Sequence, residues 1–269
     1  MAAASSLAAP SEVNVSALWK EAETRVGISI SIPSTRQVPD YERQGVAFAP
    51  LNVVESRGGD ALDVALYLRV YTDEFSKYPR SFLRKVNVEW VAFVKGLRVA
   101  EIPRAAAYLR SYAPTTMAPR GGMVYDVQQG VTDRAYVRRT LHHEFFHFID
   151  EGVQIRGNGH ADWLALNPRG FQYTGKMANF SRTLDHPAPG IITTYSAKSS
   201  SEDRAELFAA LMDEETYPRL REIAAEDPVV RRKIGHLVRF LERIDPAMGG
   251  SYFRKRLGEH WQTVIDRPR

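Results

Sequence analysis

The sequence predicts an α+β fold, in which a mostly antiparallel sheet is backed by a helix and followed by a helical C-terminal part. Segments with strand composition alternate with one strong helical pattern in the first 130 residues, whereas helical patterns dominate after residue 200. Between these regions lies an apolar helical stretch, Thr-Leu-His-His-Glu-Phe-Phe-His-Phe-Ile-Asp at 140–150. We expect this apolar helix to cross beneath the sheet, with a cleft between the two parts.

Helices in the first half are predicted from apolar residues spaced three and four apart. One begins after Ser11, a plausible cap, and ends at Gly27. The other covers 61–78 and ends at Pro79. Shorter helices are predicted around 82–83 and at 105–112.

Strands are predicted where β-branched and aromatic residues gather. Residues 28–32 alternate in polarity, and 46–54 is interrupted by Pro50, which places that strand near an edge. The segment 86–94 has the composition of a central strand, and 121–127 is predicted to be a strand just before the apolar helix.

The apolar helix contains the pattern His143-Glu144-x-x-His147. Residues four apart lie on the same face of a helix, so the two imidazoles can share one metal ion. Glu144 then lies beside the metal, where its carboxylate can take a proton from water that the metal activates. The helix is expected to run from Thr132 to Gly152 and to be buried. Buried polar groups need partners, and for this pair with its glutamate we favour a metal over hydrogen-bonded core histidines.

A third metal ligand has to come from another part of the chain, because a catalytic zinc site has three protein ligands and one position for water. The chain contains no cysteine, so imidazole and carboxylate groups are the available ligands. Val153 stands where a third-histidine site would need histidine. A helix is predicted to begin within 199–201, and Glu202, Asp203 and Glu206 in it all qualify by type. Glu202 and Glu206 lie four apart and share a face.

These residues resemble those of HExxH zinc metallopeptidases of the gluzincin type, namely the group of the anthrax lethal factor catalytic domain, the Pro-Pro endopeptidases and similar bacterial zinc-binding metallopeptidases. The motif His-Glu-Phe-x-His-x-x-Asp of that group matches 143–150. The group has a tyrosine seven residues before its ligand glutamate and Ala-Glu three and four residues after it. Tyr195, Glu202, Ala205 and Glu206 keep this spacing.

The resemblance covers residues 120–213 and implies a zincin-like fold with one zinc ion. It implies that Glu202 is the third ligand and that Glu206 is a supporting carboxylate. In such peptidases the strand before the metal helix pairs with an extended substrate, so we expect 121–127 to be that edge strand. Residues 1–100 have no such resemblance.

Roles for the remaining polar residues follow from the chemistry of amide hydrolysis. Tyr195 could donate a hydrogen bond to the oxygen that becomes negative, with Tyr173 as the reserve, or it could be a packed loop residue. Asp150 could accept the free ring N–H of a ligand histidine, or it could be a charge at the helix end. Glu206 supports a ligand, substitutes for one, or is an exposed helix charge. His142 is left out of the metal set.

A long segment without periodicity, 153–198, separates the two metal-binding helices, and a loop of this length is usually functional. Its aromatic residues are expected to pin it to the core rather than to line a cleft. They are Trp163, Phe171, Tyr173 and Phe180. Further helices are predicted at 217–225 and at 229–244, where Pro228 occupies the first helical position.

The composition is that of a globular protein with one large domain, for which we expect the boundaries 11–245, divided into 11–130 and 131–245. The net charge of +4 is scattered, so no nucleic-acid partner is expected, and no segment reaches the roughly 18 apolar residues of a membrane span. Residues 1–10 are expected to be flexible, either as the end of a trimmed export signal or as a cytosolic terminus; a secreted or periplasmic location is slightly favoured. Residues 246–269 are expected to form a basic, irregular tail.

The predicted function is that of a zinc-dependent endopeptidase with a peptide or protein substrate and Glu144 as general base. Three alternatives remain open. The chain could be a regulatory or binding protein with the same fold and no hydrolytic activity, a metal-dependent hydrolase of a non-peptide amide, or a toxin-like effector protease with one protein target.

Overall fold

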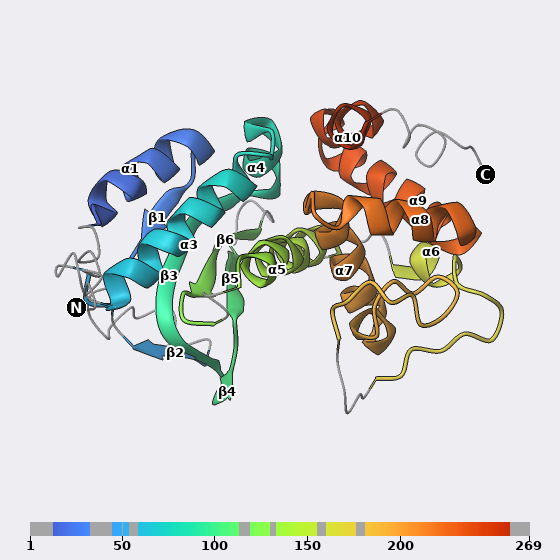
Figure 1. Ribbon diagram of the computed structural model, residues 1–269, viewed down its shortest axis with the longest axis horizontal. Helices are drawn as coiled ribbons and strands as arrows, with labels where there is room; N and C mark the ends of the chain where they lie inside the picture. The colour runs from blue at the N-terminus through green and yellow to red at the C-terminus, as the bar shows by residue number, and fades with distance from the viewer. Residues whose placement is uncertain are drawn as a thin grey trace, which may run out of the picture.

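A computed structural model describes residues 13–32, 45–49, 51–53, 59–112, 119–129, 133–154, 160–175 and 181–258. The described chain has an α+β fold. Its sheet and the helices α1, α3 and α4 lie on one side, the helices α7 to α10 lie on the other, and the long helix α5 lies between them (Figure 1).

The sheet part contains α1 (Val15–Val26), β1 (Ser29–Ser31), β2 (Val46–Ala49), α3 (Gly59–Phe75), α4 (Arg80–Val86), β3 (Val88–Val99), β4 (Ile102–Pro103), β5 (Ala106–Tyr112) and β6 (Pro119–Asp126). The helical part contains α5 (Arg134–Gln154), α6 (His160–Leu164), the 3-10 turn η1 (Tyr195–Lys198), α7 (Ser200–Met212), α8 (Tyr217–Glu226), α9 (Pro228–Ile244), the 3-10 turn η2 (Pro246–Met248) and α10 (Gly250–Leu257). The long helices predicted from periodicity are confirmed.

Helix ends follow the predicted chemistry, although two caps differ. Gly27 ends α1 with φ of 81°, the left-handed conformation that glycine adopts readily. Asn14 caps the start of α1 through a hydrogen bond from Ala17 N, whereas the predicted cap, Ser11, lies outside the described residues. The predicted cap of α5, Thr132, also lies outside them, and the carboxylate of Asp133 accepts hydrogen bonds from the first turn.

The sheet is mixed, which corrects the prediction of a mostly antiparallel sheet. Its strands follow the order β1-β3-β6-β5, and two of the three pairings along this path, β1 with β3 and β3 with β6, are parallel. The short strands β2 and β4 pair antiparallel with β3 off this path. The helices α3 and α4 lie between β1 and β3 in the chain, and such a crossover returns the chain in the same direction. The helix predicted at 61–78 already lay between the strands predicted at 28–32 and 86–94, so a parallel pairing of these strands could have been expected.

The edge strand next to α5 is β5, not the segment 121–127. β6 lies inside the sheet between β3 and β5, and β5 ends the described strand order. Residues 105–112 were predicted to be a short helix because Ala, Leu and Arg favour helices. Pairing with β6 overrides this weak preference, since neighbouring strands decide strand formation more than composition does.

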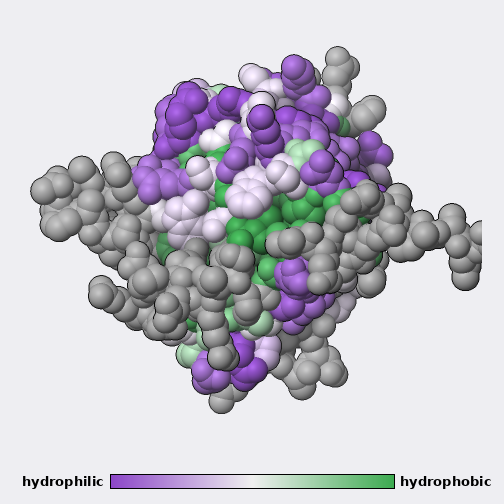
Figure 2. Space-filling view, turned by 90° about the vertical axis from the view of Figure 1, so that its left-hand side faces the viewer, coloured by the Kyte–Doolittle hydropathy of each residue, from purple (hydrophilic) through white to green (hydrophobic). Residues whose placement is uncertain are grey.

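The sheet separates two hydrophobic clusters, one on each of its faces. Val91 and Phe93 of β3 and Met123 of β6 join the main core under the helices, whereas Ala92 and Val124 join a second, smaller cluster on the opposite face. This alternation is the two-residue period of a strand. The described surface, seen from the side of the sheet part, has a hydrophobic band between two polar areas (Figure 2).

Helix α5 is buried on nearly all sides, as predicted. Its apolar residues are almost completely inaccessible to solvent and belong to the main core. They are Leu141, Phe145, Phe146, Phe148 and Ile149. The polar side chains on this helix are therefore held in a rigid, largely dehydrated setting.

The C-terminal segment departs from the irregular tail expected for 246–269. Residues 250–257 form α10, and Phe253 on this helix is fully buried in the main core. Residues 259–269 lie outside the described part. None of the helices in the described chain combines the length and hydropathy needed to cross a bilayer.

Candidate metal centre

Three side chains from two helices converge on one point. The Nε2 atoms of His143 and His147 on α5 lie 3.1 Å apart, and they lie 3.1 Å and 3.2 Å from Oε2 of Glu202 on α7. Among the described residues, these three form the one group of histidine, aspartate or glutamate side chains with ligand atoms close enough to hold a metal ion. The structure thus brings together the three predicted ligands.

The geometry fits a small divalent cation. Zinc bonds to nitrogen and oxygen are about 2.0–2.1 Å long, so ligand atoms of a tetrahedral site lie about 3.3 Å apart. The observed separations of 3.1–3.2 Å are close to this value. Because Nε2 of a neutral imidazole and a carboxylate oxygen are both acceptors when the Nδ1 atoms carry the protons, such a cluster is favourable with a cation at its centre.

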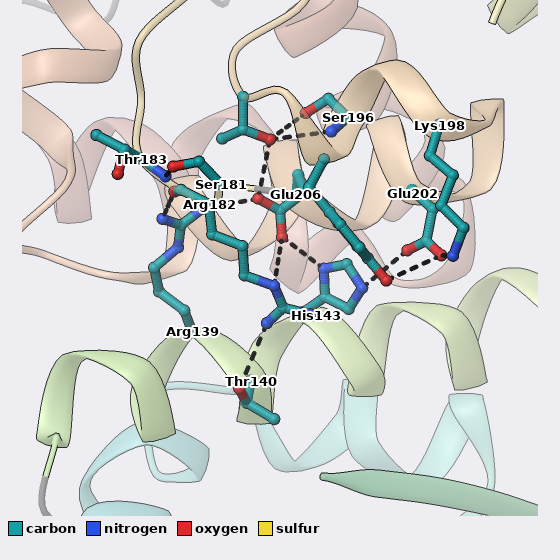
Figure 3. Close-up of polar contacts among 12 residues, drawn as sticks. Arg139, Thr140, His143, Ser181, Arg182, Thr183, Ser196, Lys198, Glu202 and Glu206 are labelled. Atoms are coloured by element: carbon teal, nitrogen blue, oxygen red, sulfur yellow. Dashed lines mark hydrogen bonds and ion pairs between the residues drawn. The ribbon is translucent and has the colours of Figure 1, made fainter. Parts of the chain in front are cut away.

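The start of α7 determines where Glu202 lies. Ser199 caps the helix by accepting a hydrogen bond from Glu202 N at 3.2 Å, so Glu202 lies in the first turn. A negative charge there is stabilised by the free N–H groups of the helix start. Glu202 faces α5 from this position (Figure 3).

Glu206 holds the outer nitrogen of His143. Its Oε1 lies 2.9 Å from Nδ1 of His143, and its Oε2 accepts hydrogen bonds from Arg139 at 2.9 Å and from Thr193 at 3.1 Å. A carboxylate in this position can accept a hydrogen bond from Nδ1–H, which leaves the lone pair of Nε2 free for a metal. Glu206 thus lies where a supporting carboxylate was expected, and its side chain is fully buried, not exposed.

The charges around Glu206 keep it ionised. Burial by itself would raise the pKa of this carboxyl group, but the hydrogen bond with His143 and the positive charges of Arg139 and Arg182 outweigh burial and lower the pKa to about 2. Figure 3 shows Arg139 and Arg182 approaching Glu206 from the side away from Glu202.

A serine meets the outer nitrogen of His147. Oγ of Ser201 lies 3.1 Å from Nδ1 of His147. Asp150, which was predicted to hold a ligand histidine, accepts a hydrogen bond from Arg204 on α7 and forms a buried ion pair with it. Nδ1 of His147 thus lies against Ser201 and Nδ1 of His143 lies against Glu206, whereas Asp150 joins α5 to α7 through Arg204.

The second oxygen of Glu202 has two donors. Oε1 accepts hydrogen bonds from Tyr195 Oη at 3.2 Å and from Lys198 Nζ at 3.0 Å, so Oε2 is the oxygen directed at the histidines. Burial would raise the pKa of Glu202, but its contacts with His143 and His147 dominate and hold the pKa far below its ordinary value. Lys198 was not among the predicted site residues, although it lies only four residues before Glu202.

Tyr195 remains a phenol in this site. Burial raises its pKa above the ordinary value of 10, and the negative charge of Glu202 adds to this effect. The guanidinium of Arg182 and the ammonium of Lys198 lie 5.0 Å and 5.2 Å from the centre of its ring. The hydroxyl group therefore keeps a proton that it can donate.

A cleft of about 640 Å³ opens beside the three ligands. Residues 104–108 of the edge-strand region, Glu144 on α5, and residues of η1 and α7 line it. Glu144 is half-buried and faces this space, whereas His142 on the same helix points into the core and contacts Tyr78 and Glu74. His142 is thus a core histidine.

The other tyrosine considered, Tyr173, belongs to a different cluster. Its hydroxyl donates to Oδ2 of Asp203 at 2.7 Å, and Trp163 Nε1 donates to the same oxygen at 3.0 Å. Lys233 on α9 completes the cluster with a 2.6 Å ion pair to Asp203. Trp163 and Tyr173 therefore pin the long loop to α7, as predicted, and Asp203 serves this anchor instead of the metal group. Phe180 lies outside the described residues.

Comparison with known proteins gives a fold but no family. No family model and no curated protein match the chain. Among solved structures, it is similar to a "putative zinc-binding metallo-peptidase" from Bacteroides caccae ATCC 43185, with 16% identity, 93% of each chain covered and a TM-score of 0.50. The chain has a zinc metallopeptidase-like fold. At this identity the likeness carries no residue roles.

Proposed function

We propose that this protein is a zinc-dependent endopeptidase. The observation that carries the proposal is the convergence of two imidazole nitrogens and one carboxylate oxygen, His143, His147 and Glu202, beside an open cleft that Glu144 also lines. The metallopeptidase-like fold supports the same reading. His143, His147 and Glu202 would hold one zinc ion, which when bound acts as a Lewis acid and makes water a stronger acid.

The protein groups divide the remaining work. Glu144 accepts a proton from the attacking water and delivers it to the departing amine. Tyr195 donates a hydrogen bond to the substrate oxygen that becomes negative. In the described structure its hydroxyl is bound to Glu202, and Lys198 binds the same oxygen. Lys198 can therefore keep Glu202 oriented while Tyr195 turns to the substrate.

The edge strand gives the substrate a place to bind. β5 ends the described sheet and its residues line the cleft. An extended peptide can pair with such an edge through backbone hydrogen bonds, which do not depend on its sequence. We place the substrate backbone along β5, where the prediction had placed it along 121–127.

Replacing Glu144 by glutamine tests this function. Glu144→Gln keeps the shape of the side chain and removes the base, so we expect zinc content to be unchanged and kcat/KM for peptides to fall by about 10²–10⁴-fold. Elemental analysis and hydrolysis of a mixed peptide library measure the two quantities. Glu226→Gln, at an exposed position on α8, is the matched control. Equal hydrolysis by Glu144→Gln and the wild type would contradict the proposal, and a zinc-loaded wild type that hydrolyses no peptide would favour a binding protein.

A further inference from the structure

We infer that the cleft selects substrates that carry a carboxylate group, held by Arg104 and Lys198. The inference rests on the proposed function, because it concerns the substrate of the same site. It follows from the charges that face the cleft and from the way each of them is already engaged.

The described lining of the cleft has an excess of positive charge. Three basic side chains line it, Arg104, Arg182 and Lys198, against the two carboxylates of Glu144 and Glu202. Behind this lining, Glu206 forms an ion pair with Arg139, and these two charges cancel. The excess is one positive charge before a metal binds, and a divalent ion adds two more.

One of the three cations is already committed to the protein. Nε of Arg182 lies 3.5 Å from Glu206, its Nη1 donates to Thr140 at 3.4 Å, and its guanidinium covers the ring of Tyr195. Its side chain is only 24% exposed. Arg182 therefore orders the site and has little capacity for a ligand.

Arg104 has the opposite character. It lies between β4 and β5, where the edge strand begins, and its side chain is exposed. Within the described part of the chain no ion pair is formed by Arg104, so its charge faces the cleft without compensation. A substrate chain that runs along β5 passes this guanidinium.

Lys198 approaches the same space from η1. Its ammonium lies 3.0 Å from Oε1 of Glu202, and its side chain is 33% exposed. Lys198 therefore adds a second positive charge to the wall of the cleft while it stays beside Glu202. Arg104 and Lys198 thus offer two cations, on elements far apart in the sequence, to a carboxylate in the cleft.

The carboxylate could be an acidic side chain or the C-terminus of the substrate. Ten-residue fluorescent peptides that differ at one central position, Glu, Gln or Lys, separate charge from size when both ends are blocked. A fourth peptide with Gln and a free C-terminus tests the terminal group. Binding to zinc-loaded Glu144→Gln is measured by fluorescence anisotropy at low and high salt, and hydrolysis of the same peptides by the wild type is measured in parallel.

We expect a carboxylate-bearing peptide, with Glu or with the free C-terminus, to bind roughly three- to tenfold more tightly than blocked Gln at low salt, and blocked Lys to bind more weakly than blocked Gln. High salt should reduce these differences, because exposed charges are screened. If only the peptide with the free C-terminus binds more tightly than blocked Gln, the terminal carboxylate is the bound group. If neither carboxylate binds more tightly than blocked Gln, the inference is overturned, and if no peptide binds, both the inference and the proposed function fail.

Single substitutions assign the preference to its residues. Arg104→Gln and Lys198→Gln should each reduce the preference for the carboxylate by roughly two- to fivefold, with zinc content measured for both. Arg232→Gln removes one exposed positive charge from α9, outside the cleft lining, and should leave the preference unchanged. If Arg232→Gln reduces the preference for the carboxylate equally, the effect comes from net charge, and the role assigned to the cleft residues is wrong. If the carboxylate peptides bind more tightly but no peptide is hydrolysed, only the proposed function is wrong. If peptides are hydrolysed without any preference for a carboxylate, only this inference is wrong.

Discussion

At the residue scale, two glutamates on one face of α7 have different neighbours. Glu202 turns one oxygen to the two histidine Nε2 atoms, while Glu206 turns one to Nδ1 of His143. The distinction lies in which nitrogen each carboxylate meets. A ligand has to share a free electron pair with the metal, whereas a supporting group accepts a hydrogen bond from the N–H on the far side of the imidazole ring.

This difference predicts that substitutions of Glu202 and Glu206 weaken zinc binding to different extents. Glu202→Ala removes a ligand, so we expect the variant to contain close to no zinc after dialysis. Glu206→Gln leaves all three ligands, and we expect zinc affinity to fall about 10–100-fold. Elemental analysis and competition with a chromophoric chelator measure these outcomes. If Glu202→Ala retains zinc as well as the parent protein does, the third ligand has been misassigned.

At the element scale, the pairing of β3 with β6 depends on a missing side chain. Trp90 lies opposite Gly122, and a Cβ atom added at Gly122 would lie 2.1 Å from the indole ring. Gly122→Ala should therefore lower the free energy of unfolding by about 1–3 kcal/mol, measured by denaturant titration. Gly59→Ala, where a Cβ meets nothing within 4 Å, is the control. The cost at Gly122 should shrink in a Trp90→Ala background, and an unchanged cost would contradict this explanation.

The junction between the long loop and α9 depends on one carboxylate. Asp227 caps α9 through Val229 N and Val230 N, and it accepts further hydrogen bonds from Gly190 N and Nε2 of His186. Burial would raise the pKa of Asp227, but these hydrogen bonds, led by that from Gly190, outweigh burial and lower it.

A lowered pKa means that the ionised carboxylate stabilises the fold above its ordinary pKa of 3.8, and that this stabilisation is lost as the pH falls below that value. At neutral pH we expect Asp227→Asn to unfold with a free energy lower than that of the wild type by about 1 kcal/mol. The two proteins should converge as the pH falls from 4 towards 2. Denaturant titrations across this range measure the difference, and a constant gap would show that the charge of Asp227 contributes nothing.

At the scale of the whole molecule, the candidate metal site joins the central helix α5 to α7. The candidate ligands His143 and His147 come from α5, which packs against the sheet and against α7, and Glu202 comes from α7. The buried pair Asp150–Arg204 joins the same two helices. An ion held between them should therefore stabilise the native molecule as a whole.

Removing zinc should consequently lower the melting temperature. A ligand present at 100 times its Kd stabilises a protein by about 2.7 kcal/mol, which corresponds to roughly 5–10 °C for a chain of this size. Thermal unfolding with chelator, and again after zinc is restored, measures the shift. His147→Ala should show no response to either treatment. A wild type whose melting temperature ignores both chelator and zinc would contradict the proposed site.

Local patterns predicted the elements whose cause is local. The helices α3, α5, α7 and α9 and the central strand β3 follow from periodicity and composition over ten or more residues, and the spacing of His143 and His147 fixes their common face. The segment 106–112 was wrongly predicted to be helical, because its strand depends on β6, which follows later in the chain. The roles given to the site residues stay predictions until they are measured.

Four-residue spacing in a helical pattern was enough to put two imidazoles on one side of a buried helix with a glutamate beside them, because helix geometry allows no other arrangement. The folded molecule was needed to see which carboxylate meets Nε2 and which meets Nδ1, that Ser201 lies against Nδ1 of His147, and that β5 forms the edge of the described sheet. Those outcomes depend on how α7 and the sheet pack against α5, and packing joins residues that no local pattern relates.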